Sequence, residues 1–411
     1  MLRLLFLLLI ISQVSFAQTR YFDPSFGVGV TYGRPYGESN KKQGEGGEKM
    51  VTLLMDVYQP LNDTLKNRPL IIFAHGGAFL MGDKNNFPME TLCSRFAQMG
   101  YVTASINYRK TFIKAPTDQL SGEKTVIRPI HDMKAAVRYF RKSVVENGNP
   151  YGVDTSWIWV GGSSAGAIVA LHVAYLDSQD IKHLELNLDN WGGLEGNSGN
   201  PGYSSKVHGV INLCGAIGDT AFMNEALPVI NIHGSEDPIV PVNDDSIRYD
   251  LPLVYIPRVK LQGSECIYAR NLEHDTPSEI HLFPNQGHCP YDKTLDRKRY
   301  PVNMDITVNL IRNFLYNTYW NTGPPVTDKS TSHATAIDWD YKDGTMQFYP
   351  VDKAVKKIKI YVMDENYERM KKKVLRKKLK AFTWKYTPPE TPHIITVRYN
   401  GFYRTKHYPT P

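Results

Sequence analysis

The fold is decided by ten residues, Trp157-Ile158-Trp159-Val160-Gly161-Gly162-Ser163-Ser164-Ala165-Gly166. The apolar run at 157–161 predicts a buried strand, and a helical pattern begins at Ala165 directly after the turn. A serine on a sharp strand-to-helix turn holds its hydroxyl where it can attack a carbonyl, and such a strained turn tolerates little bulk. Glycines two residues before and two residues after Ser164 meet that requirement. We therefore predict that Ser164 is a nucleophile and that the amide of Ala165 helps to bind an oxyanion.

The flanking sequence alternates short apolar runs with longer segments of helical period. The runs are nearly continuous in apolar residues, as expected of strands buried on both faces, and lie at 70–74, 102–108, 157–161, 207–213, 229–233 and 280–283. The helical patterns occupy 86–99, 130–147, 165–177 and 305–316. Two earlier strands, at 27–33 and 51–58, have no helix between them and predict an antiparallel edge. The fold class is therefore α/β, with a mostly parallel eight-stranded sheet and helices on both faces.

A glycine-rich loop follows the strand at 70–74 and reads His75-Gly76-Gly77-Ala78-Phe79. A loop of this kind offers backbone amides to a developing oxyanion. We predict that Gly76 and Gly77 donate these hydrogen bonds together with Ala165. Because His75 begins the donor loop, we expect it to shape the loop and not to act as a base.

Ser164 needs a general base, and the base needs an acid that orients it. The acid should follow a later strand, and the strand at 229–233 leads into a loop with Asp237, whose only close competitor is Glu236. Of the twelve histidines, His288 stands in a turn just beyond the strand at 280–283. We predict Asp237 as the acid and His288 as the base. Four other histidines lie in a strand or in or beside helices and are expected to be structural or solvated: His131, His172, His183 and His281.

The order Ser164, Asp237, His288 is that of the α/β-hydrolase superfamily, and the chain from about Leu54 to Phe314 resembles that superfamily. The resemblance is to the carboxylesterase/lipase side, in particular to secreted bacterial esterases of the feruloyl-esterase-like group. Besides the loop and the elbow, the matching stretches are Met55–Pro60, Ser105–Arg109, Asp132–Ala136, His233-Gly234 with Asp237, and Gly287-His288. One departure is Ala78, where many relatives carry a third glycine; this should leave the amide donors in place.

The resemblance implies ester hydrolysis through an acyl-enzyme, without a metal or an organic cofactor. The substrate would be a small-molecule or polymer-linked ester, such as an acetyl or feruloyl ester of a polysaccharide. Arg109 and Asp132 belong to the match and are expected to form a structural ion pair. A nonenzymatic binding protein on this fold would require a broken triad, and the sequence shows none.

The alternative function is a serine peptidase of the prolyl-oligopeptidase type, which belongs to the same superfamily. Those enzymes usually carry a propeller before the hydrolase domain, whereas only residues 18–74 separate the predicted signal from the His75 loop. No large cap is expected, since only Gly215–Pro228 separates two strands. We expect Lys110–Arg128 to face the substrate and Gly192–Ser205 to lie at the edge of the sheet opposite the active site.

The N-terminal residues 1–17 predict a secretory signal: Arg3, an apolar run over Leu4–Ile11, and small residues at Ser15 and Ala17. The run is shorter than a bilayer span, and we expect no transmembrane segment and a secreted, periplasmic or cell-surface location. Export permits disulfides among the four cysteines, but the sequence does not select a pairing. They are Cys93, Cys214, Cys266 and Cys289.

The composition changes after residue 320. We predict a catalytic domain over 18–320, a Gly-, Pro-, Ser- and Thr-rich linker over 321–335 and a small β-sandwich module over 336–411. The module holds 17 Lys and Arg against 8 Asp and Glu, although the whole chain of 411 residues carries only +7. That mild total gives no reason to expect nucleic acid as a partner.

Three interpretations of the predicted module over 336–411 remain open. It resembles, loosely, the C-terminal sorting domain of the bacterial type IX secretion system, so the secretion machinery is one possible partner. It could instead bind a polysaccharide surface through its basic stretch, or serve only as a stabilising appendage.

Overall fold

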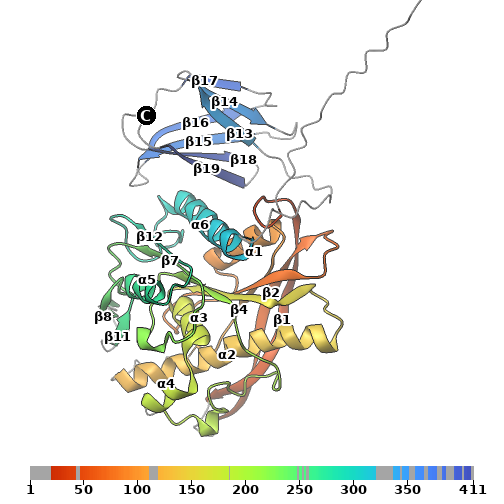
Figure 1. Cartoon of the computed structure of the whole chain (residues 1–411), viewed down its shortest axis with the longest axis vertical. Helices are drawn as coiled ribbons and strands as arrows, with labels where there is room; N and C mark the ends of the chain where they lie inside the picture. Colours follow the sequence, from red (N-terminus) through yellow and green to blue (C-terminus); the bar gives the residue numbers. More distant parts are fainter. Residues whose placement is uncertain are drawn as a thin grey trace, which may run out of the picture.

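The computed structural model (Figure 1) describes residues 20–42, 47–110, 119–184, 186–247, 250–251, 254–255 and 259–320, together with strand segments between 337 and 408. The predicted secretory signal at 1–17 and the predicted linker at 321–335 lie outside the described residues.

Within the described residues, eight strands form one sheet in the order β1-β2-β4-β3-β5-β6-β7-β12. Their bounds are β1 Gly27–Lys42, β2 Gly47–Leu61, β3 Arg68–Ala74, β4 Val102–Ile106, β5 Val153–Ser163, β6 Gly209–Leu213, β7 Val229–Gly234 and β12 Ser278–Phe283. Pairing is parallel from β4 through β3, β5, β6 and β7 to β12, whereas β2 runs antiparallel to both β1 and β4. The predicted α/β-hydrolase sheet with an antiparallel edge is confirmed.

Helices cover both faces of this sheet. They are α1 Phe87–Gln98, α2 Gln119–Glu146, α3 Ala165–Tyr175, α4 Ser178–His183, α5 Ser264–Glu273 and α6 Tyr300–Trp320. Residues of α1 and α6 share one buried apolar cluster, and residues of α2, α3 and α5 share the other. Because the parallel strands point the same way, their carboxyl ends meet at one edge, where such sheets place their ligand sites.

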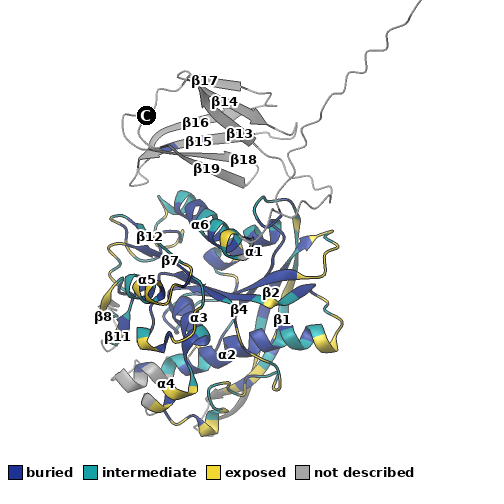
Figure 2. Cartoon of the chain, viewed as in Figure 1, coloured by how far each residue is buried: buried dark blue, intermediate teal, exposed yellow. Residues whose placement is uncertain are grey.

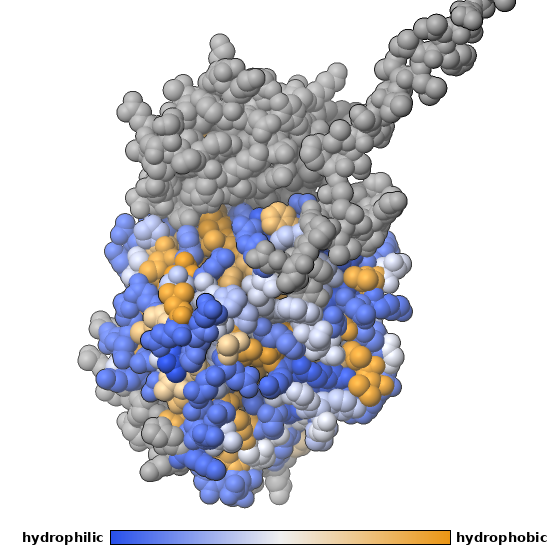
Figure 3. Space-filling view, in the orientation of Figure 1, coloured by the Kyte–Doolittle hydropathy of each residue, from blue (hydrophilic) through white to orange (hydrophobic). Residues whose placement is uncertain are grey.

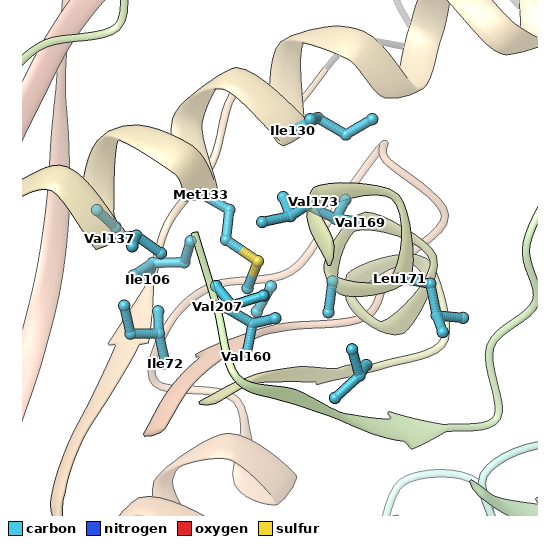
Figure 4. Close-up of a cluster of buried hydrophobic side chains, with 14 of the residues drawn as sticks. Ile72, Ile106, Ile130, Met133, Val137, Val160, Val169, Leu171, Val173 and Val207 are labelled. Carbon is cyan, nitrogen blue, oxygen red and sulfur yellow. The ribbon is translucent and has the colours of Figure 1, made fainter. Parts of the chain in front are cut away.

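The larger cluster explains why α3 is so apolar. Every residue of α3 except Ala174 is buried, as Figure 2 shows for this central helix. A helix that is hydrophobic all round belongs inside a core, and α3 lies between the sheet and α2. Figure 4 shows side chains of α2, α3 and the strands converging there, among them Met133, Val137, Val169, Ile72 and Val160. This packing fixes the helix whose first residue follows Ser164.

Helix α2 begins earlier than the sequence indicates. The helical pattern predicts a start near residue 130 and a substrate-facing loop over Lys110–Arg128, but α2 already runs from Gln119 and passes through Pro129. Tertiary contacts hold the added turns: Ile127 is buried in the larger cluster, and the Arg128 guanidinium lies 5.3 Å from the centre of the Trp191 ring. The expected loop is therefore wrong for 119–128, and residues 111–118 lie outside the described residues.

The segment between β7 and β12 contains structure that the sequence patterns missed. Beyond the loop that carries Asp237 come four short strands, β8 Asp244–Ser246, β9 Asp250–Leu251, β10 Val254–Tyr255 and β11 Lys260–Gln262, followed by α5. They pair only locally, β8 with β11 and β9 with β10. An isolated bridge from Ile217 to Gln262 connects this segment to the one after β6. Strands of two or three residues carry too little periodicity to be recognised.

Gly192–Ser205 does not lie where the sequence analysis puts it. Its first half contacts residues at the carboxyl end of β4: the Ser198 hydroxyl lies 2.9 Å from the Arg109 guanidinium, and the Ser198 carbonyl accepts from the amide of Glu38 at 3.1 Å. Its second half lies beside the C-terminal part of α2, where Arg141 donates to the carbonyl of Ser204 at 2.7 Å. The placement opposite the active-site edge is therefore wrong for the first half, because the segment contacts α2 from Asp132, beside Arg109, to Glu146 at its end.

The strands described after residue 336 form two antiparallel sheets. They are β13 Ile337–Lys342, β14 Thr345–Pro350, β15 Lys357–Asp364, β16 Arg369–Arg376, β17 Phe382–Lys385, β18 His393–Tyr399 and β19 Phe402–Tyr408. One sheet has the order β13-β14-β17 and the other β16-β15-β18-β19. The described elements are β throughout, and the domain bounds stay predictions.

The surface shown in Figure 3 is mostly hydrophilic, with apolar side chains in scattered patches over the coloured residues. None of the described helices combines the length and the hydropathy that a bilayer span requires.

Candidate active site

Ser164 stands on the turn between β5 and α3, in the backbone geometry that the glycine spacing predicts. Its φ of 54° and ψ of −118° are unfavourable for a residue with a side chain. A methyl group added at Gly162 would lie 2.4 Å from the carbonyl carbon of Gly166, and one at Gly166 would lie 2.1 Å from the carbonyl oxygen of Ala74. The amide of Ser164 donates to the carbonyl of Leu213 in β6 at 2.8 Å. The turn is therefore held on both sides and has no room for larger residues.

The structure brings Ser164, His288 and Asp237 together, although they lie far apart in the sequence. The Ser164 Oγ lies 2.8 Å from Nε2 of His288, and Nδ1 of His288 lies 2.6 Å from Oδ2 of Asp237. In the neutral imidazole that acts as the base, Nδ1–H donates to the carboxylate and Nε2 accepts from the serine hydroxyl. Ser164 and His288 have little exposed surface, and the Asp237 side chain has none.

The Asp237 carboxylate is held by four donors. Besides His288, Nε2 of His233 lies 3.0 Å from Oδ2, and the amides of Ile239 and Val240 donate to Oδ1 at 2.8 and 3.1 Å. Burial by itself would raise the pKa of this carboxyl group, but hydrogen bonds from His233 and His288 lower the pKa far below its usual range. Asp237 is therefore ionised wherever the protein is folded at ordinary pH.

The protonated form of His288 is stabilised by its surroundings. Burial alone lowers the pKa of His288, but the sulfur of Cys289 and the Asp237 carboxylate raise it, and the resulting pKa is about 10. Cys289 is the next residue in the chain, and its side chain is buried. The neighbours of the base therefore determine the pH at which it becomes free to accept a proton.

The loop after β3 lies against the serine. A methyl group at Gly76 would be 3.3 Å from Cβ of Ser164, so its backbone is in close contact with the nucleophile. Gly77 has a φ of 118°, and the amides of Leu80 and Met81 fold back onto its carbonyl at 3.0 and 2.9 Å. The amide of Ala165, the first residue of α3, has no acceptor within the helix. Of the three positions predicted to bind an oxyanion, Gly76 lies against Ser164 and Ala165 follows it directly, whereas Gly77 packs on Met81.

The positions of Glu236, the competing acid, and of His75 exclude both residues from the triad. Glu236 is exposed, whereas Asp237 points inward. His75 is fully buried, with its ring stacked on Tyr108 at a centroid distance of 4.4 Å and its Nδ1 2.7 Å from the carbonyl oxygen of Gly76. Burial lowers the pKa of His75 to about 4, so the ring is neutral. His75 therefore shapes the loop from within.

Three of the remaining histidines have structural surroundings, and none of them contacts Ser164. Nδ1 of His172 lies 2.7 Å from the carbonyl of Ile168, and its Nε2 accepts from the amide of Gly218 at 3.1 Å. His131 is buried beneath Gly196, and His281 meets Phe283 edge to face. The side chain of His183 lies outside the described residues.

Arg109 and Asp132 form the expected buried ion pair. The guanidinium Nε lies 3.0 Å from both carboxylate oxygens, and the Arg109 amide also donates to this carboxylate at 2.8 Å. The Ser198 hydroxyl adds a hydrogen bond to Asp132 at 2.7 Å. The pair joins the end of β4, helix α2 and the 192–200 segment. Its contacts are structural.

Sequence reasoning missed the residues that surround the acid and the base. His233 is the penultimate residue of β7, and its Nδ1 lies 2.8 Å from the hydroxyl of Ser264, which in turn lies 3.1 Å from Nδ2 of Asn212. Next to the serine, the Ser163 hydroxyl lies 2.8 Å from the hydroxyl of Tyr291. The one sequence signal for these residues is that polar side chains stand near the ends of strands that are otherwise apolar.

Two overlapping groups of side chains could hold a metal ion. The ligand atoms of Cys214, His288 and Cys289 lie within 4.8 Å of one another, as do those of Cys214, His233 and Asp237. Thiolate and imidazole donors suit soft ions. Both ring nitrogens of His288 already serve Ser164 and Asp237, so an ion bound by His288 would have to compete with those contacts.

Comparison with known proteins supports an α/β-hydrolase of the esterase kind. Residues 55–226 match the family model described as BD-FAE. Arylacetamide deacetylase-like 3 of Homo sapiens is 28% identical over 140 residues, which are 33% of this chain and 30% of that protein. The chain thus spans less than a third of the length of that curated relative.

Among solved structures, esterase 2 of Thermogutta terrifontis in its apo form matches with 18% identity and a TM-score of 0.47, covering 72% of this chain and 96% of the esterase. Its propionate-bound form matches with 17% identity and a TM-score of 0.46, covering 72% and 97%.

Proposed function

We propose that this α/β hydrolase is a serine carboxylic-ester hydrolase that cleaves short-acyl or aryl esters through an acyl-enzyme. The observation that carries the proposal is the hydrogen-bonded chain from Ser164 through His288 to Asp237, built on a strained elbow beside a glycine-rich loop. A serine hydroxyl, an imidazole and a buried carboxylate in this geometry are the machinery of acyl transfer.

In the first half of the reaction, Ser164 Oγ attacks the ester carbonyl carbon while Nε2 of His288 takes the hydroxyl proton. Nδ1–H of His288 keeps its hydrogen bond to Asp237, whose charge stabilises the imidazolium. The amides of Gly76, Gly77 and Ala165 stabilise the oxyanion of the tetrahedral intermediate. The imidazolium then gives its proton to the leaving alcohol oxygen, and the acyl group remains on Ser164.

In the second half, water replaces the alcohol. Nε2 of His288 takes a proton from the water as its oxygen attacks the acyl carbon, and the same amides hold the second oxyanion. When that intermediate collapses, Ser164 Oγ leaves with the proton from His288, and the carboxylic acid is released. Each step needs only groups that the chain supplies, so no metal or organic cofactor takes part in the proposed mechanism.

The proposed substrates are esters on small or polymeric carriers, including acetyl or feruloyl groups on polysaccharide. The segment between β6 and β7, residues 215–228, is short, which leaves room for a bulky alcohol. The match of residues 55–226 to the BD-FAE family model supports an ester substrate.

The proposal includes export and a C-terminal module. The N-terminal pattern at 1–17 supports secretion to the periplasm, the cell surface or the medium. The basic β strands after residue 336 would then contact either the secretion machinery or an acidic polysaccharide.

A hydrolysis panel tests the proposed activity. The purified protein is assayed on short p-nitrophenyl esters, acetylated xylan, methyl ferulate and a dipeptidyl arylamide. We expect kcat/KM on at least one ester to exceed that on the arylamide by orders of magnitude. Ser164→Ala, prepared in parallel, reveals any contaminating hydrolase. If the arylamide is the better substrate, the protein is a peptidase and the ester proposal is wrong.

A further inference from the structure

Two cysteines, Cys214 and Cys289, lie next to the base His288, and the proposed mechanism uses neither. Cys214 follows β6, and Cys289 follows His288; both are buried and both carry free thiols. Their sulfur atoms and a ring nitrogen of His288 all lie within 4.8 Å of one another. The two thiols come from loops 75 residues apart in the sequence, so only the sheet brings them together.

The backbone at both cysteines is held in an unfavourable conformation. Cys214 has a φ of 54° and Cys289 a φ of 48°, in the left-handed region that residues with a side chain rarely adopt. The amide of Cys214 donates to the carbonyl of Ile232 in β7 at 2.8 Å, which fixes this geometry. Residues in this conformation persist only where the surroundings enforce it. Strain of this kind concentrates at functional positions.

The two thiols are chemically unequal. Burial by itself would raise the pKa of Cys289, but hydrogen bonding from Cys214 and the nearby imidazole of His288 lower the pKa well below its usual value. The hydroxyl of Ser163 lies 3.4 Å from the Cys289 sulfur and further favours the thiolate. Burial raises the pKa of Cys214, which stays a thiol. One thiolate beside one thiol is the arrangement of an attacking and a resolving cysteine.

We propose that Cys289 and Cys214 form a redox-sensitive modification site, which a hydroperoxide converts to a disulfide beneath His288, and that this conversion controls ester hydrolysis. This inference rests on the proposed function for its effect on activity, but not for the formation of the disulfide.

The chemistry needs only the two thiols and the peroxide. The Cys289 thiolate attacks one peroxide oxygen, the O–O bond breaks, and Cys289 becomes a sulfenic acid while hydroxide leaves and takes up a proton as water. The Cys214 sulfur then attacks the Cys289 sulfur, the S–O bond breaks, and the sulfenic oxygen leaves as a second water that carries the Cys214 proton. Two thiols are oxidised and one hydrogen peroxide is reduced to two waters. Peroxide is small enough to reach a buried sulfur, and a dithiol reductant reverses the change.

The disulfide should alter the base because it removes a negative charge next to it. The titratable groups around His288 are Asp237 and His233 at the end of β7, Cys214 at the end of β6, and Cys289, Tyr291 and Asp292 in its own segment. Among these, Cys289 and Asp237 are the ones that raise the pKa of His288. When Cys289 becomes a neutral disulfide sulfur, the pKa of His288 falls. The base is then free of its proton at lower pH, and hydrolysis extends to more acidic conditions.

The experiment compares reduced and peroxide-treated full-length protein. Peptide mass spectrometry after blocking free thiols identifies any Cys214–Cys289 bond, and kcat/KM on a p-nitrophenyl ester is measured across pH. We expect the disulfide to form and the acid limb of the pH profile to move down by roughly one to three pH units. A dithiol reductant should move the limb back.

Two variants and one matched control show whether the redox effect comes from Cys214 and Cys289 or from another cysteine. Cys214→Ala should form no disulfide and lose the reversible shift, and Cys289→Ala should show the lower acid limb before any peroxide is added. Cys266→Ser changes a cysteine in α5 outside the pair and should respond as the unmodified protein does. Circular dichroism checks that each variant is folded; if one is not, the unmodified protein alone still decides the question.

The outcomes separate this inference from the proposed function. If no Cys214–Cys289 bond forms, or if the bond forms and the acid limb does not move, the inference is wrong. If the bond forms but no ester is hydrolysed by either redox form, the proposed function has failed and the control of hydrolysis fails with it, whereas the modification site itself stands.

Discussion

At the scale of single residues, the site is defined by which atoms meet. His288 has one ring nitrogen on Ser164 and the other on Asp237, so its tautomer and orientation are fixed together. Asp237 in turn is fixed by His233 and by two backbone amides. A group held this firmly loses little entropy when it reacts, and removal of any member leaves its partners wrongly oriented.

The first residue-scale prediction concerns additivity between the nucleophile and the base. Ser164→Ala should lower kcat on an ester by on the order of 10⁶-fold, and His288→Ala by a comparable factor, because the members of a triad act as a unit. The double variant should be little slower than either single variant. Single-turnover and steady-state rates on the best ester of the panel measure this, with thermal unfolding as the check on folding. Losses that multiply in the double variant would show that the two residues act independently.

At the scale of elements, the strand–turn–helix of β5 and α3 depends on close backbone approach. Gly166 lies in the first turn of α3 and brings the helix against the end of β3. The same approach puts the start of α3 next to the loop of Gly76 and Gly77, so packing and oxyanion binding share one cause. A side chain at this position would push the helix away from the strand.

The element-scale prediction is that Gly166→Ala destabilises the protein and impairs catalysis together. The added methyl group would lie 2.1 Å from the Ala74 carbonyl oxygen, and such overpacking costs about 1–3 kcal/mol. Denaturant unfolding measures the stability, and kcat/KM on an ester measures the catalysis. Gly29→Ala is the matched control, because its methyl group would come no closer than 3.6 Å to another atom. Equal behaviour of the two variants would contradict the packing argument.

At the scale of the whole molecule, the catalytic residues and the large sheet lie within residues 27–320. Both apolar clusters are built from β1–β12, α1–α6, their connections and Tyr21 before β1. The strands β13–β19 form sheets of their own and pair with none of the eight strands of the large sheet among the described residues. Within the part of the chain that the structure describes, the contacts of the triad and its oxyanion loop therefore involve no residue after 320.

The prediction at this scale is that truncation after Thr335 leaves an active esterase. No proposed catalytic residue and no strand of the large sheet is removed, so kcat/KM on a soluble ester should stay within a few-fold of that of the full chain. In the native host, the same truncation should impair delivery to the surface or medium if the module is a sorting signal. If the module binds polysaccharide, secretion should be normal, and salt-dependent retention on insoluble polysaccharide should fall. A folded but inactive truncated protein would show that the module supports the active site.

The sequence by itself determined the local parts of this protein. Glycines around Ser164 predicted the elbow, apolar runs predicted the strands, and the order of Asp237 and His288 after later strands predicted where they stand. These features are encoded over a few residues, because backbone strain and the periods of strands and helices are local properties. Only the tertiary structure decided that Ser164 and His288, 124 residues apart, are 2.8 Å from each other.

Long-range packing also decided what the local patterns could not show. It extended α2 before Pro129 and placed Cys214 beside Cys289. Each of these depends on contacts between segments that follow different strands, and a short window of sequence carries no information about which strand ends become neighbours. The fold class and the candidate triad could therefore be predicted from the sequence. The groups that set the pKa of His288 are brought together only by the folded sheet.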